Sequence, residues 1–202
     1  MSISYREAFD VFPQTMATMY IDAFVGAAFD GTLNHHCVMM TAIAKTIPVS
    51  ALSSKYECTA LHCHVVVSTL LAVGANPNAK CSTGTTPVWW RAFAGSPRQL
   101  QQLLDAGGSV NEPDNNGSTP LIALVRGNLN NAAARMDVLF ACHELELNAT
   151  YFQYTAEEWA MTKGYPKLAV AIAGEKARRM RWGAVRLVWV AGIAPASHLV
   201  KR

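Results

Sequence analysis

The chain has 202 residues, of which 51% are hydrophobic and 15% are charged. This composition favours a folded protein and excludes a disordered, highly charged chain. No apolar run reaches the roughly 18–20 residues that a membrane-spanning helix needs, and the start, MSISYREAFDVF, lacks the basic region of a secretory signal.

The distribution of charges and cysteines bears on partners and on location. Residues 1–175 hold ten Lys and Arg against fourteen Asp and Glu, whereas residues 176–202 hold seven basic residues and no acidic one. The body is therefore mildly acidic and the C-terminal segment is basic. The five cysteines show no paired spacing, and their odd number predicts reduced thiols in a cytoplasmic protein, with the nucleus as the alternative.

The N-terminal part of the chain predicts short helices. Residues 1–18 carry a short helical pattern, which we interpret as an N-terminal helical cap. Apolar residues then recur at helical spacing from Met19 to Gly31, and a second helix is expected over residues 34–45. Residues 19–58 thus resemble one helix pair followed by a polar link. A helical cap without repeat character is the alternative for this segment.

A repeated pattern follows between Val65 and Gly127. The stretches LLAVGANPNAKCSTGTTP and LLDAGGSVNEPDNNGSTP share leucines, glycines, an asparagine and a Thr-Pro pair, all at an offset of 33 residues. A fixed period in this range indicates stacked supersecondary units rather than one compact fold. The matching positions are Leu70 and Leu103, Leu71 and Leu104, Gly74 and Gly107, Asn78 and Asn111, Gly84 and Gly117, and Thr86-Pro87 and Thr119-Pro120.

Helix-start signals divide this part of the chain into units. A threonine followed by Pro or Ala opens each unit, because its hydroxyl can cap the first helical turn and Pro is tolerated there. Starts at Thr59, Thr86, Thr119 and Thr155 give units over residues 59–85, 86–118, 119–154 and 155–175. The first of these is six residues short of the period. Its start is therefore either a truncated first helix or part of one continuous helix.

The C-terminal segment, residues 176–202, is predicted to be a basic capping helix and tail. Helical spacing places apolar residues among the basic ones, and Pro195 is expected to end the helix. Its apolar face is expected to cover the last unit while its basic face meets solvent. The alternative is a basic amphipathic helix that binds an anionic membrane surface or an acidic partner.

The pattern T-P-apolar, then G, then L-L-x-x-G-x-x-x-N at this period resembles the ankyrin repeat family. The resemblance covers residues 19–175 and is most specific over residues 70–127. It implies an all-α fold, a helix-pair solenoid with short β-hairpin loops and about five units. It also implies a non-catalytic scaffold or adaptor, expected to be a monomer, that binds another protein through its concave face and hairpin tips. A membrane-surface or regulatory tether acting through the C-terminal helix is the alternative function.

The resemblance also marks the variable positions that would meet a partner. Trp and Tyr favour recognition there, because they bury a large area with few rotatable bonds. For Trp90 and Trp159 packing between units is an equally open alternative, whereas Trp89 is expected in the core. The predicted partner-binding residues are Tyr56, Ser82, Thr83, Thr85, Trp90, Asn115, Asn116, Ser118, Tyr151, Tyr154 and Trp159, and the same series of positions includes Lys55, Cys58, Ala123 and Phe152.

Patterns that could carry chemistry are weak. No nucleophile elbow, phosphate loop or DNA-binding motif is present, so we expect no enzyme activity, no cofactor and no specific nucleic acid. In the ankyrin pattern the histidine at the position of His62 hydrogen-bonds the backbone near the helix start. One group has zinc-ligand side chains but matches no zinc-finger spacing, and its members are His35, His36, Cys37, Cys58, His62, Cys63 and His64.

Overall fold

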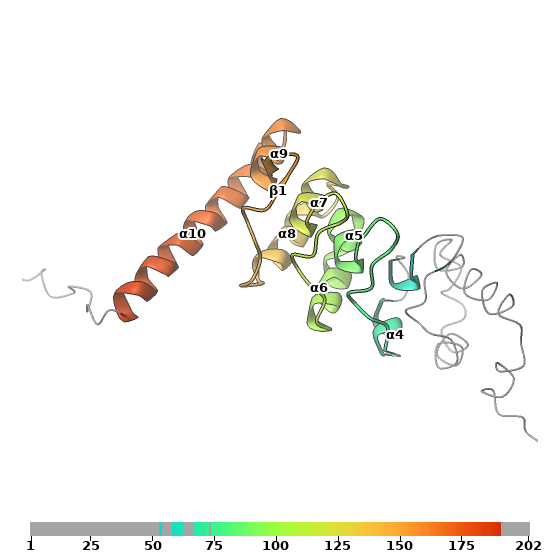
Figure 1. Cartoon of the computed structure of the whole chain (residues 1–202). Coiled ribbons are helices and arrows are strands. Elements are labelled where there is room, and N and C mark those ends of the chain that lie inside the picture. Colours follow the sequence, from blue (N-terminus) through green and yellow to red (C-terminus); the bar gives the residue numbers. More distant parts are fainter. Residues whose placement is uncertain (1–52, 54–57, 63–66, 73, 191–202) are drawn as a thin grey trace, which may run out of the picture.

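The structure is a computed structural model that describes residues 53, 58–62, 67–72 and 74–190, with side chains described as far as residue 182. This part of the chain is mostly helical, as the sequence predicts (Figure 1). The predicted cap over residues 1–18 and nearly all of the predicted helix pair at 19–58 lie outside the described residues. The choice between a truncated and a continuous helix rests on residues 63–66 and lies outside them too.

The elements follow one another as helix pairs joined by longer links. In chain order they are η2 (Ala60–His62), α4 (Val67–Ala72), α5 (Pro87–Ala94), α6 (Pro97–Asp105), α7 (Pro120–Arg126), α8 (Ala132–Phe140), β1 (Thr150–Tyr151), β2 (Tyr154–Thr155), α9 (Ala156–Thr162) and α10 (Pro166–Val190). Helix α10 runs without a break through the predicted boundary at residue 176. Residues 176–190 of the basic segment therefore continue the helix that begins at Pro166.

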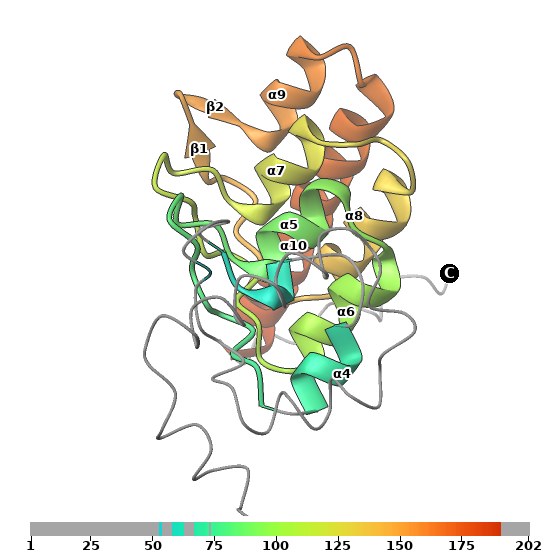
Figure 2. The same ribbon diagram turned by 90° about the vertical axis from the view of Figure 1, so that its right-hand side faces the viewer.

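The helices form two adjoining rows. Helix α5 packs against α7, and α7 packs against α9, while α6 lies between α4 and α8. Figure 2 shows the links and the β1–β2 hairpin projecting to one side of the α5–α7–α9 row, with α6 and α8 on the other side. Helix α10 packs against α9 and extends beyond the stack in Figure 1.

Leucine stripes hold the two rows together. Leu100 and Leu103 of α6 are fully buried, and they belong to one continuous core with Leu121, Leu139 and Ile172. Removing one such side chain from water contributes about 1.5–3 kcal/mol. A single pair of short helices cannot bury its stripe alone, so each pair depends on its neighbours.

Polar residues fix where the helices begin. The hydroxyls of Thr86 and Ser96 accept the backbone N–H groups of Trp89 and Gln99, each with Pro at the next position. Thr155 and Glu158 form a reciprocal capping box at the start of α9. The helix starts predicted at Thr86, Thr119 and Thr155 are confirmed, although the side chain of Thr119 makes no capping hydrogen bond at α7.

The links that contain Gly84 and Gly117 differ from the predicted hairpins. Gly84 and Gly117 have positive φ, and each lies in a tight turn closed by a backbone hydrogen bond, from the N–H of Cys81 to the carbonyl of Thr85 and from the N–H of Asp114 to the carbonyl of Ser118. Among residues 74–149, however, the structure contains no strand. In the described part of the chain, strands form only at β1 and β2.

Two asparagines join neighbouring links. The Asn78 side chain donates to the Gly107 carbonyl at 2.9 Å and accepts from the Ser109 N–H at 2.7 Å. Asn111 lies 33 residues later and makes the same two contacts with the next link, at Glu144 and Glu146. Because each amide satisfies two backbone groups of the following link, it fixes the register of one helix pair on the next.

Gly107 gives a stability prediction. Its φ is +86°, and nothing lies within 4 Å of the position a Cβ would take, so a side chain there meets backbone strain without a clash. We expect Gly107→Val to lower the free energy of unfolding by about 1–2 kcal/mol. Gly174 is a matched control, because it lies in helix α10 with equally open space. Gly174→Ala should stabilise the protein by up to about 1 kcal/mol in the same urea titration. A neutral Gly107→Val result would contradict the assigned end of α6.

Candidate functional site

The predicted partner-binding residues divide by exposure. Tyr56, like Lys55, lies outside the described residues. Trp90 and Trp159 are partly buried. The exposed members of the set are Ser82, Thr83, Asn115, Asn116 and Tyr154, and the buried members are Thr85, Ser118 and Tyr151.

The buried members correct the prediction. Thr85 and Ser118 precede the helix-opening threonines, and their carbonyls accept hydrogen bonds from the preceding pair, Thr85 from His62 and Ser118 from Trp89. Tyr151 is 8% exposed because its ring packs under Phe152 and Trp159. These three side chains support the surface from below and are not available to a partner.

Both tryptophans of the predicted surface have internal partners. The Trp90 indole N–H donates to the Thr85 hydroxyl at 2.9 Å, and the Trp159 indole N–H donates to the Tyr151 carbonyl at 3.0 Å. Trp90 also lies edge-on to Trp89 and Phe93. Each ring is therefore held in one orientation, and only part of it faces solvent. The expectation that Trp89 lies in the core is confirmed, since it is 8% exposed.

An aromatic cluster forms where the β1–β2 hairpin meets α9. It contains Tyr151, Phe152, Tyr154 and Trp159, whose ring centroids lie 4.5–5.9 Å apart in the three contacting pairs. The guanidinium of Arg126, from α7, lies 4.3 Å from the Tyr151 ring centroid and 5.8 Å from that of Trp159. A cation over aromatic faces is attracted by their negative potential. Arg126 thus joins α7 to the cluster.

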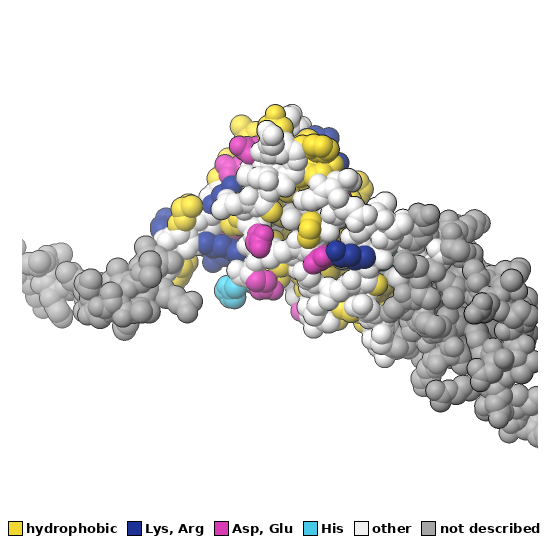
Figure 3. Space-filling model, in the orientation of Figure 1, with side chains coloured by type: hydrophobic (Ala, Val, Ile, Leu, Met, Phe, Trp, Pro, Cys, Tyr) yellow, Lys and Arg dark blue, Asp and Glu magenta, His cyan; other side chains and the backbone are white. Residues whose placement is uncertain are grey.

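The tip of this hairpin is strained and exposed. Phe152 and Gln153 have φ of +48° and +67°, and they connect the pair Tyr151 and Tyr154. Positive φ at both central residues belongs to the two-residue turn that glycine and asparagine usually supply. At this tip the Phe152 side chain is 71% exposed and the Tyr154 side chain is 49% exposed. Figure 3 shows hydrophobic side chains gathered at the top of the view, over α9 and the hairpin. Strain held at an exposed aromatic position favours a binding role for it.

The strain at Phe152 can be measured by two substitutions. Phe152→Gly and Phe152→Ala both remove the ring, but only Gly adopts positive φ without a steric penalty. We expect the Gly variant to be more stable than the Ala variant by about 1 kcal/mol in chemical denaturation. Equal stabilities would mean that residue 152 does not hold this conformation in solution.

His62 has a structural role that the sequence analysis anticipates. Its Nδ1 accepts the Thr59 backbone N–H at 3.2 Å, so its Nε2 carries the hydrogen and donates to the Thr85 carbonyl at 3.0 Å. Both ring nitrogens are thereby used. Within the described part of the chain, no group of three His, Cys, Asp or Glu side chains could hold a metal. The other histidines of the zinc-type group lie outside it.

His62 also gives a prediction on pH. Burial lowers the pKa of its imidazole below the ordinary value, which means that the folded state disfavours protonation. The unfolded chain therefore binds more protons, and stability should decrease as the pH falls below about 6.5. Denaturation midpoints measured between pH 7.5 and 5 should show this slope, and His62→Gln should reduce it. If the variant kept the same slope, the pH dependence of stability would come from titratable groups other than His62.

The basic residues of α10 are largely engaged within the fold. Arg178 and Arg179 both bond to Glu175, which is 7% exposed, and Lys176 pairs with Glu157 at 2.9 Å. The hydrogen bond from Arg178 lowers the pKa of the Glu175 carboxyl. Three of the four basic side chains described beyond residue 175 therefore have acidic partners. Fewer positive charges remain for an anionic surface than the sequence suggests.

Two residues outside the predicted partner-binding set, Phe152 and Arg126, shape the aromatic cluster. Phe152 belongs to the variable positions but is absent from the predicted set, although an aromatic residue in a turn without glycine is a usable signal. The sequence contains no pattern that marks Arg126, because its position over Tyr151 depends on how α7 packs beside the hairpin.

In the described part of the chain, no helix is long and apolar enough to cross a membrane.

Comparison with known proteins gives partial similarities. No family model matches the chain. The inactive serine/threonine-protein kinase TEX14 of Bos taurus is 44% identical over 55 residues, which are 27% of this chain and 4% of that protein. The protein of the same name from Mus musculus is 31% identical over 114 residues, which are 54% of this chain and 8% of that protein. The chain thus spans less than a tenth of the length of these relatives.

Proposed function

We propose that this chain is an ankyrin-like repeat module that binds another protein and carries no catalytic activity. The 33-residue period and the successive helix pairs support the repeat assignment. Two kinds of contact that recur from one helix pair to the next also support it. The side chains of Asn78 and Asn111 bond to the backbone of the following link, and those of His62 and Trp89 bond to the carbonyl before the next helix-opening threonine. The two similar proteins are named as an inactive kinase, which is compatible with a non-catalytic role.

The exposed tip of the aromatic cluster is the observation that carries the binding role. Phe152 and Tyr154 present large apolar rings to solvent from a hairpin whose backbone is strained. Tyr151, Trp159 and Arg126 hold these rings from behind. Rigid aromatic residues surrounded by polar ones are typical of the residues that dominate protein interfaces. The exposed turn residues Ser82, Thr83, Asn115 and Asn116 extend this surface along the row of links.

The experiment uses a double variant at the tip. A partner is first captured from lysate with the full chain, and its affinity is then measured by calorimetry for purified proteins. Phe152→Ala with Tyr154→Ala should weaken binding by roughly thirtyfold or more, since interface hot spots contribute about 2 kcal/mol or more. Circular dichroism should remain unchanged, because both side chains are exposed.

Met161 supplies the matched control. It is 61% exposed and lies on α9 two residues after Trp159, on the opposite side of the helix. Met161→Ala removes a similar apolar side chain from the same helix and should leave the affinity within about twofold. Equal losses in the control and the double variant would contradict a specific role for the hairpin tip.

A membrane or regulatory tether through α10 is the second candidate. Met180 and Trp182 are 70% and 66% exposed beside Arg181, which favours contact with an apolar, anionic surface. The case for a membrane tether is weakened by the ion pairs of Lys176, Arg178 and Arg179, because these charges already have partners within the protein. Trp182→Ala with Arg181→Ala should abolish sedimentation with phosphatidylserine vesicles if the tether exists. A cytoplasmic, monomeric protein remains our expectation.

A further inference from the structure

Asn148 is the third member of the asparagine series. Asn78 and Asn111 each bind the carbonyl of one residue and the N–H of the residue two positions later in the next link. In an extended main chain, the carbonyl of one residue and the N–H of the residue two positions later point to the same edge of the chain. One amide therefore recognises extended backbone whatever its side chains are.

Asn148 occupies the same place in its own link. It directly follows the buried Leu147, just as Asn111 directly follows the buried Val110. Its side chain is exposed, and it makes no hydrogen bond to any residue in the described part of the chain. The amide thus has the position and chemistry of its two predecessors, without their backbone partner among the described residues.

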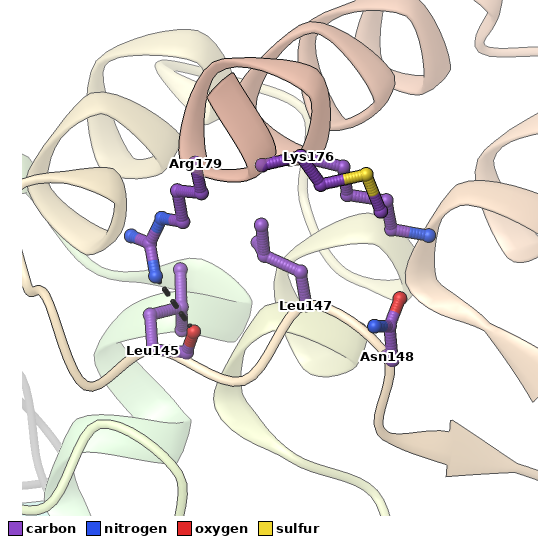
Figure 4. Close-up of a pocket in the computed structure, with 6 residues that line it drawn as sticks. Leu145, Leu147, Asn148, Lys176 and Arg179 are labelled. Atoms are coloured by element: carbon purple, nitrogen blue, oxygen red, sulfur yellow. Dashed lines mark hydrogen bonds between the residues drawn. The ribbon is translucent and has the colours of Figure 1, made fainter. Parts of the chain in front are cut away.

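A pocket of about 200 Å³ lies beside Asn148. In the two preceding pairs the second helix ends, at Asp105 and at Phe140, and the chain crosses back as the link that the asparagine binds. Helix α10 instead continues to Val190, so that no described residue takes the place of such a link. Figure 4 shows Leu147 and Asn148 below α10, with Lys176 and Arg179 above them. The pocket is lined by Leu145, Leu147, Asn148, Lys176, Arg179 and Met180.

The two cations of the pocket are not free to hold an anion. All five N–H groups of the Arg179 guanidinium are used, by Glu175 and by four backbone carbonyls. Lys176 pairs with Glu157. The groups that remain are the Asn148 amide and an apolar wall that includes Met180, which is 70% exposed. This combination suits main chain with an aliphatic side chain rather than a phosphate.

We propose that Asn148 and this pocket bind an extended segment of a partner protein as a further link of the series. The Asn148 amide bonds a carbonyl and an N–H two residues apart in that segment. The residue after the N–H donor is aliphatic and buried in both occupied cases, Val110 after Ser109 and Leu147 after Glu146. The partner segment therefore carries an aliphatic residue at that position. The site continues the contact between links and is separate from the aromatic cluster.

A peptide copied from the chain itself provides the probe. Residues 143–149, HELELNA, contain the segment that Asn111 binds, and they can be made as a fluorescent peptide with blocked ends. Binding to the full chain is followed by anisotropy, with ¹⁵N spectra reporting the Asn148 side-chain amide. Asn148→Ala should weaken binding about tenfold or more, because two hydrogen bonds are lost. Asn130→Ala, an exposed asparagine of another loop, should leave it unchanged.

The peptide backbone offers a second, independent test. Methylation of the nitrogen that corresponds to Glu146 removes the required donor and should abolish binding, whereas methylation at the nitrogen of Leu145 should be tolerated. Equal binding by the Asn148→Ala protein, or no binding at all, would overturn the proposal. Binding that appears only after removal of residues 191–202 would assign the position to the chain's own end and overturn it as well. Tyr154→Ala should not affect this probe, so the two surfaces are tested separately.

Discussion

Arg135→Ala is expected to lower the free energy of unfolding by about 3–5 kcal/mol. The Arg135 side chain is fully buried, and its guanidinium donates to the carbonyls of Ala92, Asn128 and Asn130. Alanine would leave these carbonyls without their donor and open a cavity between two helix pairs. The loss is a large share of the 5–15 kcal/mol that stabilises a typical domain. Thermal denaturation should show the melting temperature reduced by roughly 10 °C.

Arg135 is informative because it is buried and has no carboxylate partner among the described residues. Burial lowers the pKa of the Arg135 guanidinium, yet arginine stays charged at any physiological pH. Arg135→Lys keeps the charge but cannot reach three carbonyls with one ammonium, so it should recover only part of the loss. Arg98→Ala, at an exposed position of α6, should change stability by less than about 0.5 kcal/mol. A cost below 1 kcal/mol for Arg135→Ala would mean that water replaces the side chain.

Arg179→Ala is expected to detach α10 from the preceding helix pair, at a cost of about 2–4 kcal/mol. The Arg179 guanidinium donates to the carbonyls of Phe140 and Cys142, where α8 ends, and of His143 and Leu145 in the following link. Positive charge at a helix C-terminus is stabilising, because the last carbonyls of the helix lack partners. Hydrogen exchange should show faster exchange at the end of α8 and in the first half of α10.

Two neighbours on the same helix serve as controls for this variant. Arg178 is half-exposed and pairs with Glu175 alone within the described part of the chain, so Arg178→Ala should cost less than about 1 kcal/mol. Arg181→Ala removes an exposed charge and should be neutral within about 0.5 kcal/mol. If all three variants lost the same stability, the effect would come from net charge and not from the carbonyl contacts.

Local rules predict much of the fold. The helix starts at Thr86 and Ser96 follow from capping chemistry, and the positive φ of Gly84, Gly107 and Gly117 follows from their place in a repeated pattern. These features depend on a few neighbouring residues, so they are visible in the sequence. The strands expected beside the turns of Gly84 and Gly117 are wrong, whereas the β1–β2 hairpin does form in the link before α9. Turn residues specify the turn, but whether strands flank it depends on where the chain goes next.

The candidate site is less accessible to prediction. Thr85 and Ser118 occupy variable positions, yet their carbonyls are needed by His62 and Trp89, and those contacts bury both residues. The role of Arg126 depends on packing between α7 and the hairpin. Arg135 resembles any basic residue of a helix until its carbonyl partners, one of them 43 positions away in the sequence, are known. Side-chain roles that join distant segments leave no local pattern.

The contacts between helix pairs also determine how the protein should unfold. Asn78, Trp89, Asn111, Arg135 and Arg179 each bond to the backbone of a neighbouring pair, so their energy is lost as soon as either neighbour opens. In a linear array, strong coupling between neighbours relative to the stability of each pair makes intermediate states rare. The described helix pairs should therefore melt as a single cooperative block. The dependence of the unfolding free energy on denaturant concentration, the m-value, should therefore match the surface exposed when the whole block unfolds, and should exceed that of one helix pair.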